Sequence, residues 1–372
     1  MYSSYRDADL NSDPVIVLSC GHLFTVESLD GHVDLKSYYH IDDTGEILGP
    51  KPVQEPKLKG CPDCRAPMLN IHRYNRAVKA ALLDESTRRF IASSTKMLTK
   101  TTTKVEGWET NLEQHVNDFK AQKSGGFVSQ TGALTAYRIK SDNYVRQMNS
   151  YLHSVELQEQ PYGRVQSMVV NAKRRHDISS QFEIDKSALQ HGSYLRGRCL
   201  RLRLLFAVLW NYKELAKEFD DEAANNLWET DLLKKMALAL EECKSLDRDA
   251  RAQIYPKESI EARVYSVQFT AIFLQWSKFG ANEEGGAAAY VEETKQQAQA
   301  ILDQCRREVP DSARYIENHI DNAEKLIRGA VFYEFVTPAE WREVMQGMAR
   351  EFSGSGHWYN CENGHPVCCA QL

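Results

Sequence analysis

The chain has 372 residues, of which 42% are hydrophobic and 26% are charged, and its formal net charge is −5. These proportions are typical of a soluble protein with two or three domains, and so small a net charge gives no whole-molecule attraction to nucleic acid or to membranes. No run of about 18 apolar residues occurs, so the sequence predicts no transmembrane helix and no membrane partner.

The start of the chain, residues 1–14, is polar and acidic and lacks the apolar core of a signal peptide. We therefore expect the protein in the cytoplasm, with the nucleus as the alternative, and both compartments keep thiols reduced. The nine cysteines then predict free thiols or metal ligands and not disulfides. Three of them stand alone within helical patterns and predict buried thiols: Cys199, Cys243 and Cys305.

Two short runs rich in β-branched residues, 15–18 and 23–26, predict a small hairpin with Gly21 at its turn. Asp, Gly and Pro cluster at 42–45 and 49–52 and predict loops there. A helix is predicted to begin at Asn75. The segment before this helix has little apolar core, which raises the question of what holds it together.

Four residues of this segment have the spacing of metal ligands. Cys20 and His22 are two residues apart on the predicted hairpin, and Cys61 and Cys64 form a Cys-Pro-Asp-Cys knuckle. Three thiolates and one imidazole complete a tetrahedron around zinc and leave no open position, which predicts a structural ion. Asp63 could orient a ligand, although a solvated loop residue is the favoured interpretation. Other histidines of the segment, among them His32 and His40, are interpreted as ordinary imidazoles.

From about residue 84 the sequence predicts a body of long helices. Apolar residues recur at steps of three or four, which gives each helix one apolar stripe. Stripes of this kind occupy 200–219, 232–243, 260–276, 301–309 and 315–331. The second of them is predicted to consist of Leu232, Leu233, Met236, Leu240 and Cys243. We expect a mainly α protein in which these helices pack as antiparallel neighbours in a bundle, with their aromatic residues in the core.

The end of the chain carries a second candidate metal motif. Cys361 and His365 stand in the string Gly-His-Trp-Tyr-Asn-Cys-Glu-Asn-Gly-His and could begin a zinc site. The remaining ligands are absent or lie beyond Leu372, because Cys368 and Cys369 are adjacent and lack the spacing of a ligand pair. The predicted domains are therefore a zinc module (1–83), a helical bundle or spacer (84–345) and an incomplete finger (346–372).

The first motif resembles the second half of a RING finger, in which eight ligands bind two zinc ions. The four candidate ligands match the third, fourth, seventh and eighth positions of that family. The fifth and sixth positions carry Thr25 and Ser28, and no cysteine precedes Cys20. The resemblance implies a RING-like module that has kept one zinc site and lost the other.

The terminal string resembles the opening of the RZ-type zinc finger, which is found in a giant AAA ubiquitin ligase and in helicases with NF-X-type fingers. The segments 18–32, 59–67 and 70–74 are similar to the region that follows the fingers in those helicases. These matches cover about a fifth of the chain, at its two ends. They imply the C-terminal part of an NF-X-type helicase family protein, linked to RNA surveillance, silencing or innate defence. The phosphate-binding loop of the helicase motor does not occur in this chain.

Two stretches have a locally positive charge, namely 173–176 and the arginines at 196, 198, 201 and 203. Exposed basic side chains can contact the phosphates of RNA. The favoured interpretation is instead a solvated face, or ion pairs with the acidic stretch 218–222.

Two functional hypotheses follow. The favoured one is a zinc-binding interaction module that binds protein, RNA or both and has no catalytic residue. The alternative is a RING- or RZ-type ubiquitin ligase with a ubiquitin-conjugating enzyme as its partner, for which Cys361 and His365 would be the residues at stake. A hydrolase or a redox enzyme would need a nucleophile-and-base pair that the sequence does not offer.

Overall fold

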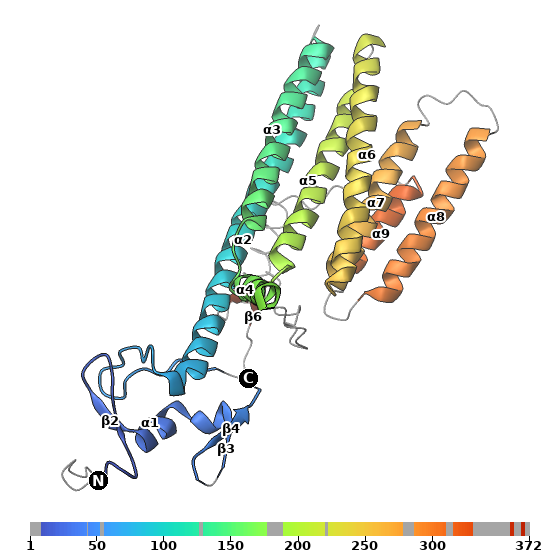
Figure 1. The fold of residues 1–372 in the computed structure, drawn as a ribbon. Coiled ribbons are helices and arrows are strands. Elements are labelled where there is room, and N and C mark those ends of the chain that lie inside the picture. Colours follow the sequence, from blue (N-terminus) through green and yellow to red (C-terminus); the bar gives the residue numbers. More distant parts are fainter. Residues whose placement is uncertain are drawn as a thin grey trace. The chain divides into compact units, whose positions relative to one another are not determined.

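The computed structural model describes residues 9–42, 44–52, 56–125, 129–176, 189–219, 222–277, 286–309, 315–329, 358–360 and 366–368. Helices dominate these residues, which confirms the predicted mainly α fold (Figure 1). The chain divides into two compact units, one made of Met1–Thr102 and Arg146–Arg198 and the other of Thr103–Val145 and Cys199–Leu372.

Three long helices contribute residues to both units: α2 (Asn75–Gly125), α3 (Gln130–Glu156) and α5 (Gly192–Ala216). The predicted domain boundary between residues 83 and 84 falls within α2, which is continuous there. The boundary between 345 and 346 lies outside the described residues. The limits of the three domains therefore remain predictions.

The N-terminal part of the first unit is built from short elements. In chain order these are β1 (Val15–Val17), β2 (Leu23–Thr25), α1 (Val26–Val33), η1 (Leu35–Ser37), β3 (Tyr39–Ile41), β4 (Ile47–Pro50) and η2 (His72–Tyr74). β1 pairs with β2 and β3 with β4, both antiparallel. The predicted hairpin at 15–26 is confirmed, and Gly21 in its turn has a φ of 84°, a conformation that glycine adopts without strain.

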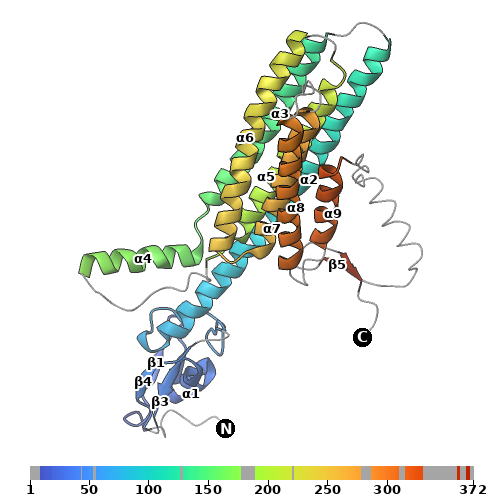
Figure 2. The same cartoon turned by 90° about the vertical axis from the view of Figure 1, so that its right-hand side faces the viewer.

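A small apolar core lies beneath these elements and extends onto the start of α2. It comprises Leu18, Leu29, Val33, Leu35, Tyr38, Cys61, Met68, Tyr74, Ala77 and Val78. At its edge the Asp30 carboxylate on α1 accepts hydrogen bonds from Arg73 Nε (2.8 Å) and from the Tyr74 hydroxyl (3.0 Å). These bonds attach α1 to η2, which leads directly into α2. Further along the unit lies α4 (Pro161–His176), seen lengthwise in Figure 2.

The second unit contains four consecutive helices, α6 (Glu222–Ala252), α7 (Pro256–Ser277), α8 (Gly286–Glu308) and α9 (Tyr315–Ile327). α7 packs against α6, α8 and α9, and the four lie side by side in both views (Figures 1 and 2). Pro256 is the first residue of α7, a position where its missing N–H costs nothing. Among the described residues no helix has the length and apolar character required to cross a membrane.

The predicted apolar stripes form the core of this unit. Along α5, Leu204, Val208 and Tyr212 are all buried, as their spacing predicts. Leu233 on α6 is 40% exposed, so its assignment to a stripe is wrong. The buried side of α6 runs through Leu232, Met236, Ala239 and Cys243, and Leu233 lies about 100° around the helix from Leu232.

Aromatic side chains lie in the core of the second unit, as predicted. Tyr137 on α3 stacks on Tyr212 with 5.4 Å between ring centroids, and its hydroxyl donates to the Val208 carbonyl at 2.7 Å. The three solitary cysteines are also buried, which confirms their prediction as core thiols. Burial raises the pKa of each thiol, to about 11 for Cys305, so these sulfurs stay protonated.

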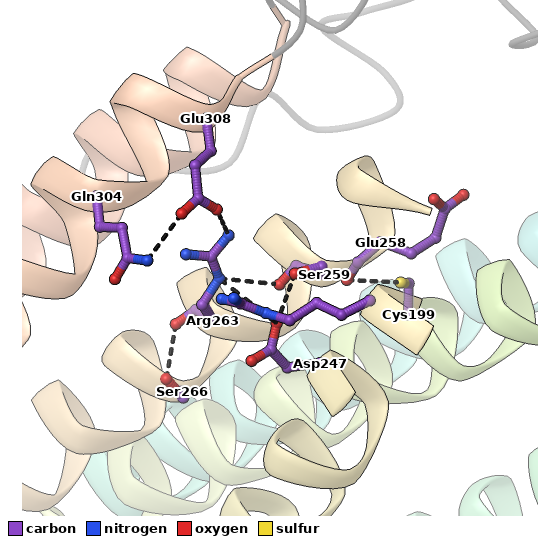
Figure 3. Close-up of polar contacts among 9 residues, drawn as sticks. Cys199, Asp247, Glu258, Ser259, Arg263, Ser266, Gln304 and Glu308 are labelled. Carbon is purple, nitrogen blue, oxygen red and sulfur yellow. Dashed lines mark hydrogen bonds and ion pairs between the residues drawn. The ribbon is translucent and has the colours of Figure 1, made fainter. Parts of the chain in front are cut away.

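A polar network links α6, α7 and α8 within this core (Figure 3). Arg263 on α7 is 10% exposed and pairs with Asp247 on α6 and with Glu308 on α8. Asp247 also accepts hydrogen bonds from Arg251 Nε (2.9 Å) and Ser259 Oγ (2.5 Å). A buried guanidinium is tolerated only when carboxylates surround it in this way.

Two arginines of α5 form ion pairs, which is one of the two interpretations offered from the sequence, but their partners are not in the acidic stretch 218–222. Arg203 makes a bidentate contact with Glu109 on α2 (2.8 and 2.7 Å), and Arg201 lies 3.7 Å from Glu242 on α6. The predicted partner, the acidic stretch 218–222, is therefore wrong for these two residues. Helix packing brings distant carboxylates closer to them than their neighbours in sequence.

Candidate metal centre

The hairpin of β1 and β2 positions the first two candidate ligands. Its register pairs Val17 with Leu23, so Cys20 and His22 lie in the connection between the strands. The turn closes through hydrogen bonds from Leu18 N to the His22 carbonyl and from Gly21 N to the Leu18 carbonyl, both 2.9 Å long. Cys20 and His22 therefore lie at the tip of a short, hydrogen-bonded turn.

The knuckle at 60–67 positions the other two ligands. Cys61 N donates to the Ala66 carbonyl and Arg65 N donates to the Cys61 carbonyl, each over 2.8 Å. The chain reverses here through a left-handed residue, Arg65, with a φ of 60°. The Cys61 side chain is buried in the apolar core, whereas Cys64 is exposed.

Two residues beside the knuckle were not recognised as structural from the sequence. A Cβ added to Gly60 would lie 2.4 Å from the Arg65 carbonyl oxygen, so only glycine fits there. The Gly60 carbonyl in turn lies 2.9 Å from His32 Nε2, which can donate to it from the last turn of α1. No spacing in a single sequence signals either contact, since both depend on how the loop folds back.

The structure brings all four predicted ligands together. The donor atoms of Cys20, His22, Cys61 and Cys64 lie within 4.8 Å of one another, and Cys20 Sγ is 3.3 Å from His22 Nδ1. Donor atoms bound to one tetrahedral ion through bonds of about 2.0–2.3 Å lie roughly 3.3–3.8 Å apart, so a modest adjustment of the side chains would bring all four onto one ion. The group can therefore hold a metal ion, and it is the one such cluster within the described part of the chain.

The local electrostatics also suit a cation. Burial disfavours the thiolate of Cys61, but donation from the backbone N–H groups of Cys64 and Asp63 outweighs it and lowers the pKa of Cys61. The N–H of Ala66 favours the Cys64 thiolate, yet burial and the neighbouring Cys20 and Cys61 raise its pKa overall. Crowded thiols of this kind ionise together only when a cation neutralises them, because like charges oppose each other.

His22 presents its two ring nitrogens in different directions. Nδ1 faces Cys20 Sγ, whereas Nε2 lies 4.0 Å from the Asp63 carboxylate. A ligating imidazole commonly directs its second nitrogen at a carboxylate, which fixes the ring orientation. Asp63 is 61% exposed, so it is a solvated loop residue that also lies close enough to influence the His22 ring.

The two positions at which the resemblance to a RING finger would require further ligands have another role here. Thr25 is the N-cap of α1, and its hydroxyl accepts a hydrogen bond from Ser28 N at 3.3 Å. Such a cap satisfies one of the free N–H groups at a helix start. Thr25 and Ser28 therefore begin a helix in this protein.

The second predicted metal pair, Cys361 and His365, lies outside the described residues. The strands that precede and follow it in the sequence, β5 (Trp358–Asn360) and β6 (Pro366–Cys368), pair antiparallel. The second site stays a prediction.

Comparisons with protein-family models, with curated proteins and with solved structures return no match for this chain. Its function must therefore be argued from its residues and their geometry.

Proposed function

We propose that this chain is a zinc-binding interaction module, in which a one-zinc, RING-like unit binds a protein partner and the helices carry that unit. The observation that supports it is the convergence of Cys20, His22, Cys61 and Cys64 to within 4.8 Å of one another. We extend the proposal to membership of the NF-X-type helicase family and to a cytoplasmic location, on the motifs at the two ends of the chain.

The donor set favours zinc over other metals. Three thiolates and an imidazole suit a borderline-soft ion in tetrahedral geometry, whereas magnesium and calcium take oxygen ligands. Four protein ligands leave no position for water or substrate, so such an ion stabilises the fold and performs no chemistry.

The surface beside the centre supports a binding role. Val17 and Leu23 are cross-strand neighbours on the hairpin and are 64% and 46% exposed. Exposed apolar side chains on a rigid turn are suitable contacts for a protein partner. Their position depends on the hairpin, which the ion would attach to the knuckle.

The proposal is tested by measuring the metal content of the full chain by mass spectrometry. We expect the Cys61→Ser variant to contain one equivalent of zinc less than the wild type, and Cys361→Ser to leave that equivalent in place. If wild-type protein purified without chelators contains no zinc, or if Cys61→Ser keeps its full zinc content, the proposal is wrong.

Ubiquitin transfer is the other outcome to test. Thr25 caps α1 by accepting from the Ser28 N–H, which supports a module with a single metal site and argues against a complete RING. We therefore expect no auto-ubiquitination with a panel of conjugating enzymes. If the wild type shows auto-ubiquitination and Cys61→Ser does not, the protein is a ubiquitin ligase and the proposed binding role is wrong.

A further inference from the structure

The structure separates the two basic stretches of the sequence. Arg201 and Arg203 on α5 contact carboxylates within the helical core of the second unit. The arginines of α4 differ, because α4 has no acidic residue between Pro161 and His176. In the part of the chain that the structure describes, Arg164 is the α4 arginine that lies near a carboxylate. Its Nε is 3.7 Å from Glu159 Oε1, and both side chains are 68% exposed.

Burial divides α4 into two faces. The half-buried face carries Tyr162, Val165, Val169 and Lys173. Met168, Val170 and Ala172 are among the exposed residues. The polar residues of the exposed side are Arg164, Ser167, Asn171, Arg174 and Arg175, of which the first four follow one another at steps of three and four and the last is adjacent to Arg174. We call these five residues the α4 polar face.

The composition of the α4 polar face matches the contacts that proteins make to phosphates. Arginine, serine and asparagine are among the side chains that hydrogen-bond to nucleic-acid backbones. The face runs from Arg164 to Arg175, about 16 Å along the helix. It is therefore long enough to follow several successive phosphates, with no carboxylate on the helix to repel them.

We propose that the α4 polar face binds the phosphate backbone of a nucleic acid, without reading its sequence. This site lies apart from the metal centre and does not depend on the function proposed for it. Single-stranded RNA is the probe we choose, because its backbone is accessible and its binding depends on salt in a known way.

An anionic membrane fits the face less well. A helix that lies on a membrane turns its apolar side and the basic residues beside it towards the same surface. On α4 the apolar residues Val165 and Val169 are half-buried and face away from the arginines. Met168 and Val170 are exposed, 64% and 40%, but two such side chains do not form an insertion surface.

The test is fluorescence anisotropy of a labelled 20-nucleotide RNA of mixed sequence with the full chain, at several salt concentrations. The variant replaces Arg164, Arg174 and Arg175 with glutamine, which preserves helix propensity. We expect affinity to fall about 100-fold at ~0.1 M salt, and the slope of log affinity against log salt to decrease by about 2.

The matched control removes the same charge elsewhere, by Arg88→Gln, Arg89→Gln and Arg248→Gln. These arginines are 73%, 79% and 78% exposed and each lies next to a carboxylate. We expect this control to bind RNA within about threefold of the wild type, because its arginines are divided between α2 and α6 and do not form one face that follows successive phosphates. Equal losses in both triple variants would show that binding follows net charge, and the proposal would fail.

Three further outcomes would also overturn it. These are no binding by the wild type at low salt, binding to vesicles of phosphatidylcholine and phosphatidylserine without binding to RNA, and loss of RNA binding in Cys61→Ser while the α4 variant binds normally. The last result would assign RNA binding to the metal module. If circular dichroism shows that the triple variant has lost helix, the three single variants replace it, each with an expected loss of about fivefold.

Discussion

Cysteine serves opposite purposes in the N-terminal module and in the helical second unit. In the module, three thiols converge with one imidazole, and backbone donors lower the pKa of Cys61. In the second unit, Cys199, Cys243 and Cys305 are each buried separately, and burial raises their pKa values. The environment decides whether a thiol becomes a ligand or a small apolar side chain.

The two regions also differ in what stabilises them. The strands β1 and β2 of the module are three residues long, and its core is one small cluster. The second unit buries long apolar stripes and encloses the Arg263 network. We therefore expect the module to depend on its metal and the helices to depend on packing.

The largest effect is expected from Cys61→Ser. A structural zinc contributes roughly 10 kcal/mol to the folding of a small module, which its apolar core cannot replace. Hydrogen exchange should show loss of protection in 15–74 and unchanged protection in 256–277. Cys243→Ala is the matched control, because it should weaken protection in the helices and leave zinc content intact. Unchanged exchange of the module in Cys61→Ser would contradict the contrast.

Arg263→Ala should destabilise the second unit by about 3 kcal/mol, because it leaves Asp247 and Glu308 without their buried cation. Chemical denaturation followed by hydrogen exchange in α6 to α8 measures this loss. Arg248→Ala, at a position that is 78% exposed, should change stability by less than about 0.5 kcal/mol. Loss of zinc in Arg263→Ala would show that the two regions are not independent.

Lys213 should make the stability of the helices depend on pH. Its side chain is 3% exposed, its ammonium lies 3.6 Å over the Trp210 ring, and burial lowers its pKa from 10.5 to about 8. Between pH 8 and pH 10.5, Lys213 keeps its proton in the unfolded chain but loses it in the folded protein. The free energy of unfolding therefore rises with pH over this range.

Lys213→Met should therefore be more stable than the wild type by about 2 kcal/mol at pH 7, and the difference should shrink as pH rises from 8 towards 10.5. Denaturation of both proteins across this range is the measurement. Lys217→Met, at a position that is 40% exposed, is the control for the loss of a lysine charge nearby. If the difference in unfolding free energy between Lys213→Met and the wild type does not change with pH, the pKa of Lys213 is not lowered in the folded protein.

The smallest effect is expected from His32→Ala, which removes the contact with the Gly60 carbonyl and should cost the module about 1 kcal/mol. We then expect the rate of zinc transfer from His32→Ala to a competing chelator to be several times the rate from the wild type. His40→Ala is the control, since that side chain is exposed. Equal rates in both variants would show that the contact does not support the knuckle.

Local spacing predicted much of this protein. The hairpin, the buried stripes and the two pairs Cys20/His22 and Cys61/Cys64 depend on residues whose separations follow from strand, turn and helix geometry, whereas the approach of one pair to the other depends on the fold. Leu233 was misassigned because two adjacent leucines on a helix cannot both face a narrow core. The spacing of residues does not predict the ion pair of Arg203 with Glu109 or the contact of His32 with the Gly60 carbonyl, because long-range packing determines both.

The positions of the ligand pairs have a further consequence for the segment 23–60 between them. An ion bound to His22 and Cys61 would close this segment into a ring, as a disulfide does, but without oxidation of a thiol. The entropy of ring closure grows only with the logarithm of length. Insertions at the β3–β4 turn around Gly45 should therefore be tolerated, whereas each anchor residue is indispensable.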